Sequence, residues 1–120
     1  MDTPIFDEND GLKEQECLSI YDNSYDFYVS VLKAFYNESL KTVCKMEKAL
    51  SEKEYEEYRI LVHGLKGSGG AIGDDKLYEL ANESNALLKA GNTKDGISYH
   101  EKIISELKRV QRLIEEKVLS

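Results

Sequence analysis

Apolar residues recur every three to four positions along most of the chain beyond residue 10, which is the spacing of one face of an α-helix. No stretch shows the sustained apolar–polar alternation that is typical of a strand. Four long segments with the helical spacing, at residues 23–50, 51–73, 74–91 and 93–118, are separated by short polar turns, and a shorter one over residues 10–20 precedes them. The pattern predicts an all-α protein, an antiparallel up-and-down four-helix bundle with a short additional N-terminal helix across one end.

Residues that commonly begin or end helices refine these boundaries. Asn23 or Ser24 can cap the second helix, and weak helix formers over residues 37–40 predict a break or kink within it. Ser51 and Glu54 have the S-x-x-E spacing of a capping box, which predicts that the third helix begins there. The other predicted boundaries are Gly73 as the end of the third helix, Asp74 or Asp75 as the cap of the fourth, Gly91 as its end and Thr93 as the start of one long final helix.

The length and the N-terminal sequence bound the architecture further. A chain of 120 residues can bury a core without a metal or a disulfide, which predicts a single domain over residues 1–120. We expect residues 1–9 to be flexible. Residues 1–10 lack the basic region and the apolar run of a secretory signal, so the sequence predicts a cytoplasmic protein. No apolar run approaches the roughly 18 residues of a membrane span.

Charge and cysteine content argue against several classes of function. The net charge of −7 argues against a nucleic-acid-binding surface, which is normally basic, and predicts a monomer. No basic amphipathic segment indicates contact with a membrane. Cys17 and Cys44 lack the spacing of metal ligands, so each is expected to be a small buried apolar residue. With only two histidines, no zinc or other metal site is predicted.

The most unusual segment is residues 63–73, in which His63 and Lys66 lie among five glycines. On a helix, positions i, i+3 and i+4 share a face, so His63, Lys66 and Gly67 place a nucleophile, a cation and bare backbone side by side. This arrangement suits contact with a phosphoryl group. A glycine-rich loop is the alternative, but the apolar spacing continues through the glycines, which favours a helix.

Glycines inside a helix need a reason, because each lowers helix stability by about 1 kcal/mol relative to alanine. We expect them to permit close packing on one side of the helix and access for a partner on the other. Arg59, Ile60 and Gly70 share the helical stripe of His63, so together with Gly67 they form the predicted docking face. Arg59 is equally consistent with a solvated charge.

The segment that begins at His63 resembles a known phosphoacceptor sequence. Positions 63–68 read HGLKGS and are followed by small residues, Ile72-Gly73 and Leu77. This sequence resembles the phosphoacceptor segment of histidine-containing phosphotransfer (HPt) domains of two-component phosphorelays. The similarity extends more weakly through residues 11–13, 31–36 and 77–90, so it covers most of the chain and implies a helical phosphotransfer domain.

The resemblance implies roles for individual residues. His63 would be the phosphoacceptor of a stoichiometric carrier, which takes the group from a receiver-domain aspartate and consumes no ATP itself. Lys66 would neutralise charge on the phosphoryl oxygens, and Gly67 would leave room for the partner. Asn85 falls at the offset of a polar residue that family members place near the phosphohistidine, although glutamine, which is longer, is frequent there. Ser68 fits the small residue that follows the lysine and glycine.

The resemblance also implies partners. These are a hybrid sensor histidine kinase and a response regulator, each with a receiver aspartate. Mg²⁺ is expected on the receiver and no cofactor on this chain, which lacks a phosphate-binding loop of the GxxxxGK[ST] type. His100 has no glycine or ligand at helical spacing and is expected to be an ordinary surface residue. Two alternatives stay open, namely a helical adaptor that is never phosphorylated and a phosphoacceptor module of a larger histidine kinase.

Overall fold

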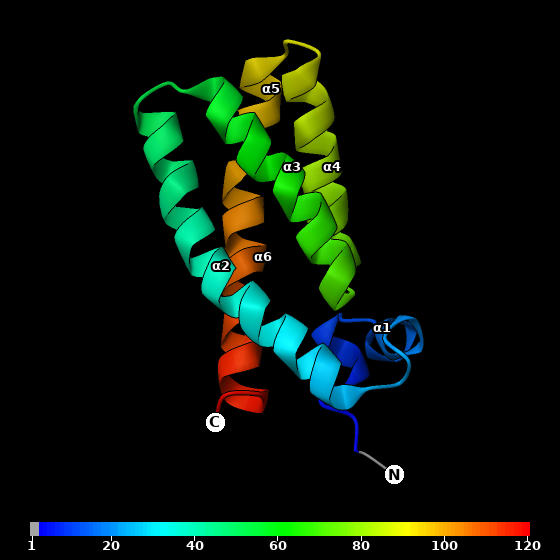
Figure 1. Ribbon diagram of the computed structural model, residues 1–120. Helices are drawn as coiled ribbons and strands as arrows, with labels where there is room; N and C mark the ends of the chain where they lie inside the picture. Colours follow the sequence, from blue (N-terminus) through cyan, green and yellow to red (C-terminus); the bar gives the residue numbers. More distant parts are fainter. Residues whose placement is uncertain (1–2) are drawn as a thin grey trace.

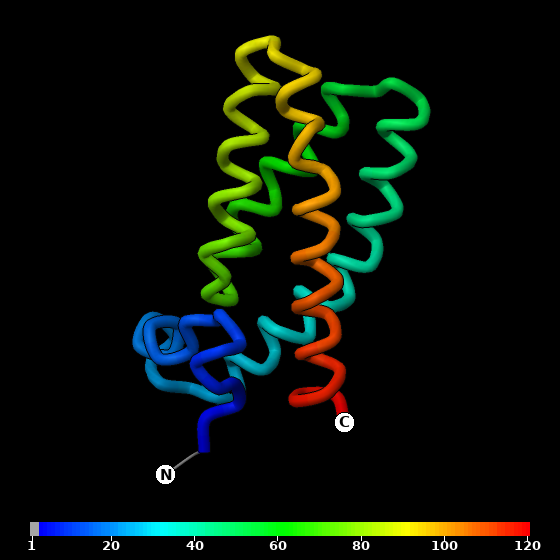
Figure 2. Tube along the Cα trace, turned by 180° about the vertical axis from the view of Figure 1, so that it is seen from behind, coloured from blue at the N-terminus to red at the C-terminus, as the bar shows by residue number. Residues whose placement is uncertain are grey.

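The computed structural model describes residues 3–120, and within that range it contains helices and turns but no strand. The helices are η1 (Glu8–Asp10, a 3₁₀ turn), α1 (Glu14–Ile20), α2 (Tyr25–Ser51), α3 (Tyr55–Ile72), α4 (Asp75–Lys89), α5 (Thr93–Ile97) and α6 (His100–Lys117). In Figure 1, α2 and α4 run in one direction along the long axis, and α3 and α6 run in the opposite direction. The predicted antiparallel four-helix bundle is therefore confirmed. The short α1 lies at the end of the bundle that also holds the C-terminus (Figure 2).

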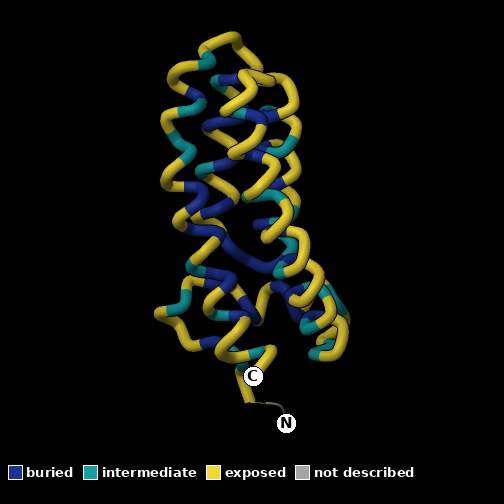
Figure 3. The backbone as a smooth tube through the Cα atoms, turned by 90° about the vertical axis from the view of Figure 1, so that its left-hand side faces the viewer, coloured by how far each residue is buried: buried dark blue, intermediate teal, exposed yellow. Residues whose placement is uncertain are grey.

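The core lies between the four long helices, and its side chains keep the predicted spacing of three to four residues. Figure 3 shows the buried positions on the inner side of the helices and the exposed ones on the outer side. The apolar and tyrosine side chains that are 0% exposed are Tyr28, Leu32, Met46, Tyr58, Val62, Ile72, Leu77, Ala81, Ile103, Leu107, Val110 and Ile114. Burial of this surface stabilises the helices more than their intrinsic propensity does.

The predicted break at residues 37–40 is wrong, because α2 is continuous from Tyr25 to Ser51. Ser39, one of the weak helix formers, is 2% exposed. Its hydroxyl donates to the carbonyl of Tyr36 at 3.0 Å and accepts from Gln111 of α6 at 2.9 Å. Packing against α6 thus overrides the low helix propensity of this segment.

The predicted capping box is also wrong. Ser51 is the last residue of α2, and Glu54 precedes α3 without a side-chain capping bond. The intervening turn passes through Lys53, whose φ of 58° is left-handed. Ser51 and Glu54 therefore belong to the end of one helix and the start of the next, respectively, and their spacing has no capping function here.

The predicted long final helix is divided into α5 and α6. Thr93 begins α5 as predicted, but the helix stops at Ile97 and α6 begins at His100. The carbonyl of Gly96 accepts a bond from the buried Ser84 hydroxyl of α4 at 2.8 Å. In a continuous helix this carbonyl would accept from the amide of residue 100, so the contact with α4 accompanies the break.

Other predicted boundaries are confirmed. The side chain of Ser24 accepts from the amide of Phe27 and so caps α2, and Asp74 caps α4 in the same way through the amide of Leu77. Gly73 ends α3 with a left-handed φ of 83°. Gly91 follows the end of α4 with a φ of 88°.

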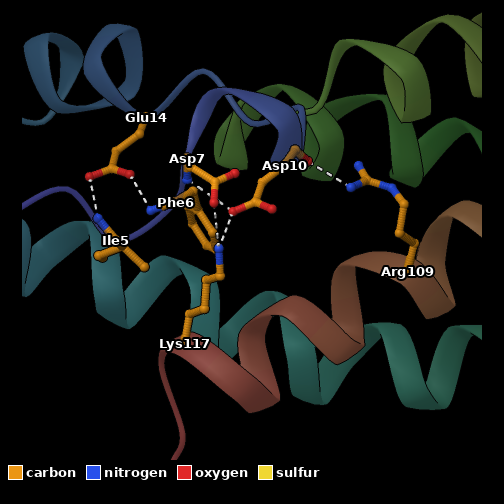
Figure 4. A network of polar contacts seen from close by, with 7 residues as sticks. All are labelled: Ile5, Phe6, Asp7, Asp10, Glu14, Arg109 and Lys117. Carbon is orange, nitrogen blue, oxygen red and sulfur yellow. Dashed lines mark hydrogen bonds and ion pairs between the residues drawn. The ribbon is translucent and has the colours of Figure 1, made fainter.

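Residues 5–10 pack against the bundle (Figure 4), and the flexibility expected for residues 1–9 stays a prediction. The carboxylate of Glu14 accepts from the amides of Ile5 at 2.9 Å and Phe6 at 2.8 Å, and the ring of Phe6 is buried. Lys117 of α6 binds the side chains of Asp7 and Asp10. The acidic side chains of this segment thus form specific bonds and are not part of a solvated tail. Residues 1 and 2 lie outside the described part.

The expectation that both cysteines are buried has a different outcome at each of them. Cys17 is buried as expected, whereas Cys44 is exposed on α2, so that expectation was wrong for Cys44.

In the described residues, no helix is long and apolar enough to cross a membrane.

Candidate functional site

Helix α3 runs without interruption through the glycine-rich segment, so the helical interpretation of residues 63–72 is confirmed. Tyr58, Val62, Leu65 and Ile72 face the core. His63 lies on the exposed side of α3. Within residues 3–120, no hydrogen bond or ion pair engages its imidazole, so both ring nitrogens are accessible to a partner.

The glycines of α3 fall into two groups. A Cβ added at Gly64, Gly67 or Gly70 would meet no atom within 4 Å. A Cβ at Gly69 would lie 3.1 Å from the amide nitrogen of Tyr78 and 3.3 Å from the carbonyl oxygen of Asp74. The first three glycines therefore leave open backbone beside His63, and Gly69 permits close contact with α4. The close packing expected on one side of the helix is therefore confirmed at Gly69, and access for a partner at the open glycines stays a prediction.

Lys66 follows His63 by three positions and is half-buried. In the part of the chain that is described, its ammonium group has no ion-pair partner. A cation without a carboxylate partner stays available to an incoming anion. Ile60 is 51% exposed on the same stripe, which places an apolar side chain next to the imidazole.

Arg59 is held by neighbouring side chains rather than being free in solvent. It makes an ion pair with Glu56 at 2.6 Å, and its Nη1 donates to Oδ1 of Asn85 at 3.5 Å. The bond with Arg59 lowers the pKa of the Glu56 carboxyl. Asn85 itself is 8% exposed on α4. The structure thus brings Arg59 and Asn85 together, a pairing that the sequence alone does not indicate.

A groove of about 210 Å³ lies between α2 and α3. Its lining residues are Val31, Ala34, Phe35, Glu38, Ser68, Ala71 and Ile72. The sequence does not predict this groove, because Val31 and Phe35 have the same spacing as core residues. The one sequence feature that could have indicated the groove is Ala34, a small residue between them that is exposed.

The sequence matches a known family model over most of its length. The family model described as the Hpt domain matches residues 30–114. The chain belongs to the Hpt domain family. The match begins within α2 and ends within α6, so it includes His63 and leaves out α1. The resemblance noted for the HGLKGS segment is thereby confirmed.

Comparison with solved structures supports the same fold. The crystal structure of the HPT domain from the Hpt sensor hybrid histidine kinase from Shewanella superposes with a TM-score of 0.80 at 20% sequence identity. The alignment covers 89% of this chain and 92% of that one. No curated protein matches the chain. Membership of the Hpt family implies a part in phosphorelay histidine phosphotransfer, the role of a module that typically lacks an ATP site.

The C-terminal carbonyls of α3 in this Hpt domain are satisfied from outside the helix. The carbonyl of Ala71 accepts from the Tyr21 hydroxyl at 2.8 Å, and that of Ile72 accepts from the Tyr28 hydroxyl at 3.0 Å. Burial raises the pKa of both tyrosines, so both hydroxyls stay protonated and able to donate. The ends of helices leave such carbonyls without partners, and here Tyr21, which follows α1, and Tyr28 of α2 supply the donors.

Backbone donors complete the end of α3. The carbonyl of Gly73 accepts from the amide of Lys13 at 2.9 Å. The carbonyls of Gly69 and Gly70 accept from the amides of Asp74 and Gly73. The helix that carries His63 is therefore fixed at this end by α1, the start of α2 and the turn into α4.

His100 differs from the ordinary surface residue that the sequence predicts. It is partly buried at the start of α6, and its Nδ1 lies 2.9 Å from the hydroxyl of Tyr58 of α3. Burial lowers the pKa of His100, which favours the neutral ring. The partner lies on another helix, so spacing along the sequence does not reveal it. In residues 3–120, no group of three or more histidine, cysteine and acidic side chains is placed to hold a metal ion.

Proposed function

We propose that this Hpt domain receives a phosphoryl group on His63 from the receiver domain of a hybrid sensor histidine kinase and passes it to the receiver domain of a response regulator. The observation that carries the proposal is the exposed imidazole of His63 on a face where Gly64, Gly67 and Gly70 leave open space. A Cβ built at any of these glycines would meet no atom within 4 Å, so this face leaves room for a receiver beside the ring. The domain acts in the cytoplasm as a monomer.

The chemistry requires an unprotonated ring nitrogen of His63. This nitrogen attacks the phosphorus of the aspartyl phosphate, a P–N bond forms, and the P–O bond to the aspartate breaks with its electron pair left on the carboxylate. In the second transfer the regulator's aspartate attacks the phosphorus and the P–N bond breaks. The receiver contributes the acidic residues and the Mg²⁺ in both steps, so this chain contributes the nucleophile and its surroundings.

Lys66 is the charge-neutralising group of this side of the site. It lies on the helical face of His63 and its ammonium has no ion-pair partner in residues 3–120. Phosphoryl transfer depends mainly on positioning and on neutralising charge over three oxygens. An unpaired ammonium at this position stabilises the transferring group without a bond to be broken in the unbound domain.

Arg59 and Asn85 act as a linked pair at the edge of the site. The guanidinium is bound to Glu56, and the amide oxygen of Asn85 accepts from it. The amide nitrogen of Asn85 is the part of this pair that is available to a phosphoryl oxygen, whereas Arg59 holds the amide in place. The docking surface consists of Ile60, Gly67, Gly70 and the groove between α2 and α3.

The test is transfer from a receiver domain that has been charged with acetyl phosphate. We expect wild-type protein to gain acid-labile, base-stable phosphate, and His63→Gln to gain none while its helical circular dichroism stays unchanged. His100→Gln is the matched control, because it removes the other histidine and should accept phosphate at the wild-type level.

Two results would overturn the proposal. Phosphate on His63→Gln at the wild-type level would mean that another residue is the acceptor. Tight binding of charged receivers by the wild type with no transfer from any of them would favour the adaptor that is never phosphorylated.

A further inference from the structure

Two carboxyl groups are buried together at the corner between α3 and α4, away from the groups used for phosphotransfer. Asp74, the cap of α4, is 0% exposed, and Glu106 of α6 is 2% exposed. Lys76, two positions after Asp74, has its ammonium 4.0 Å from Oε1 of Glu106, which places both carboxyl groups at the start of α4. Buried carboxylates need positive charge or hydrogen-bond donors, so the available donors decide the ionisation of this pair.

Glu106 forms an ion pair with the nearby cation, Arg109. Arg109 donates from Nε to Oε1 of Glu106 at 2.9 Å and from Nη2 to Oε2 at 2.7 Å. The remaining Nη1 donates to the carbonyl of Asp10 at 2.6 Å. Lys76 of α4 lies at the rim, 4.0 Å from Oε1 of Glu106. Three of the five N–H groups of the guanidinium are used in these bonds, and within residues 3–120 Arg109 makes no hydrogen bond to Asp74.

The two carboxylate oxygens of Asp74 share a single hydrogen-bond donor within residues 3–120. Its Oδ1 accepts from the amide of Leu77 at 3.2 Å. Its Oδ2 is fully buried and has no hydrogen-bond partner among residues 3–120. If Asp74 were ionised, a charged oxygen without a donor would lie next to a second carboxylate. A proton on Oδ2 removes the charge and creates an O–H group that can donate to Glu106.

We propose that Asp74 and Glu106 share one proton, and that this makes the corner between α3 and α4 a proton-binding site that joins α4 to α6. Asp74 also donates its backbone amide to the carbonyl of Gly69 at 2.8 Å. The shared proton therefore acts where the glycine-rich helix ends. This inference does not depend on phosphorylation of His63.

The electrostatics of the corner agree with this geometry. Burial, and then the hydrogen bond with Glu106, raise the pKa of Asp74 to about 8. Burial alone would raise the pKa of Glu106 as well, but the bonds from Arg109 and Asp74 lower it, so Glu106 is the ionised member. The other charged groups around the corner are Lys76 of α4, Asp10 of η1 and the exposed ion pair between Lys13 and Asp75.

The direction of the pH effect follows from proton counting. In the unfolded chain the pKa of an aspartate is about 3.9, so between pH 5 and about 7 the folded state binds one more proton than the unfolded state. Asp74 therefore stabilises the fold fully only at low pH, and this contribution declines as the pH rises and ends above the folded pKa of about 8.

The experiment compares urea unfolding of three proteins between pH 5 and pH 8. Asp74→Asn replaces the O–H donor with an N–H donor that does not titrate, so it mimics the protonated state. Asp75→Asn is the matched control, because Asp75 is the exposed neighbour. We expect the folding equilibrium constant of the wild type to fall about tenfold per pH unit relative to Asp74→Asn between pH 5 and 7, and that of Asp75→Asn to follow the wild type.

Carbon-13 NMR of the Asp74 carboxyl in the wild-type protein supplies a second measurement that needs no variant. A protonated chemical shift at pH 6 with a titration near pH 8 supports the shared proton. A carboxylate shift at pH 6, or equal pH slopes for the wild type and Asp74→Asn, would overturn it.

Discussion

Gly67 and Gly69 lie two positions apart on α3, yet substitution should affect them in opposite ways. Gly67→Gln adds a side chain where nothing lies within 4 Å, so the melting temperature should rise through the gain in helix propensity, worth roughly 0.5–1 kcal/mol. The same side chain stands beside His63, and transfer from a phosphorylated receiver should be blocked.

The control for Gly67→Gln is Gly69→Ala. A Cβ there would lie 3.1 Å from the backbone nitrogen of Tyr78, so the variant should lose stability although its helix propensity also rises. Thermal unfolding and the transfer rate are measured on both proteins. Normal transfer by Gly67→Gln would show that this glycine has no role in access.

Lys66→Ala should slow transfer more than it weakens docking. The ammonium acts on the charge of the transferring phosphoryl group, whereas docking is spread over Ile60, the open glycines and the groove. We expect the rate at saturating receiver to fall about tenfold or more, with the affinity for the receiver changed much less. Lys108→Ala, on the exposed side of α6, is the control. Equal losses of affinity and rate would assign Lys66 to recognition.

At this scale the sequence predicted the position of His63 and the division of the glycines, because helical spacing places both directly. It did not predict the partners of Arg59 and His100. Asn85 and Tyr58 lie on other helices, and a contact between helices depends on how the helices cross.

Among the helices, α3 depends on its neighbours for the bonds at its C-terminal end. Tyr28→Phe removes only the hydroxyl that donates to the carbonyl of Ile72, and it leaves that buried carbonyl without a partner. We expect a loss of about 1–3 kcal/mol in the free energy of unfolding. Hydrogen exchange of the α3 amides should accelerate more than that of the α6 amides.

Tyr36→Phe is the matched control for this prediction. The Tyr36 hydroxyl binds Glu115 at an exposed site, so its removal should have little effect on stability. An equally small effect of Tyr28→Phe would show that the end of α3 does not need the hydroxyl.

The boundaries of the helices were predicted where the deciding contact is local. Ser24, Gly73 and Asp74 act within one turn of their own position, and their predicted roles are confirmed. The prediction failed for α2 at Ser39, which is held by Gln111, and for the final helix at Gly96, which is held by Ser84. Both contacts join residues that are distant in sequence.

At the scale of the whole molecule, the stability of the fold at acid pH depends on His100. The unfolded chain takes up a proton on this histidine below about pH 6.5, whereas burial lowers the pKa in the folded state. The contribution of His100 to stability is therefore lost as the pH falls through 6.5 towards its folded pKa. His100→Gln keeps an acceptor for the Tyr58 hydroxyl and should reduce this acid-side loss, by up to about tenfold in the unfolding constant per pH unit.

The measurement is urea unfolding of the wild type, His100→Gln and His63→Gln between pH 7.5 and pH 5. His63→Gln should follow the wild type, because His63 is exposed and makes no bond within residues 3–120. Parallel curves for the wild type and His100→Gln would contradict the prediction.

The architecture was the most predictable feature of the chain. Amphipathic spacing fixes the number and direction of long helices, and short turns force neighbours to run antiparallel. The groove between α2 and α3 was not predictable, since it depends on the separation of two helices whose residues have the same pattern as a core.

The bonds between residues 5–10 and α6 (Figure 4) have a consequence for folding kinetics. Arg109 and Asp10 are separated by 99 positions, and Lys117 and Asp10 by 107. Contacts that close so long a loop are expected to form after the rate-limiting step, since the helical hairpins can assemble first. Lys117→Met should then speed unfolding about twofold to fivefold and leave the refolding rate unchanged in stopped-flow measurements. The N-terminal segment would act as a latch that sets how long the folded molecule persists, without affecting how quickly it forms.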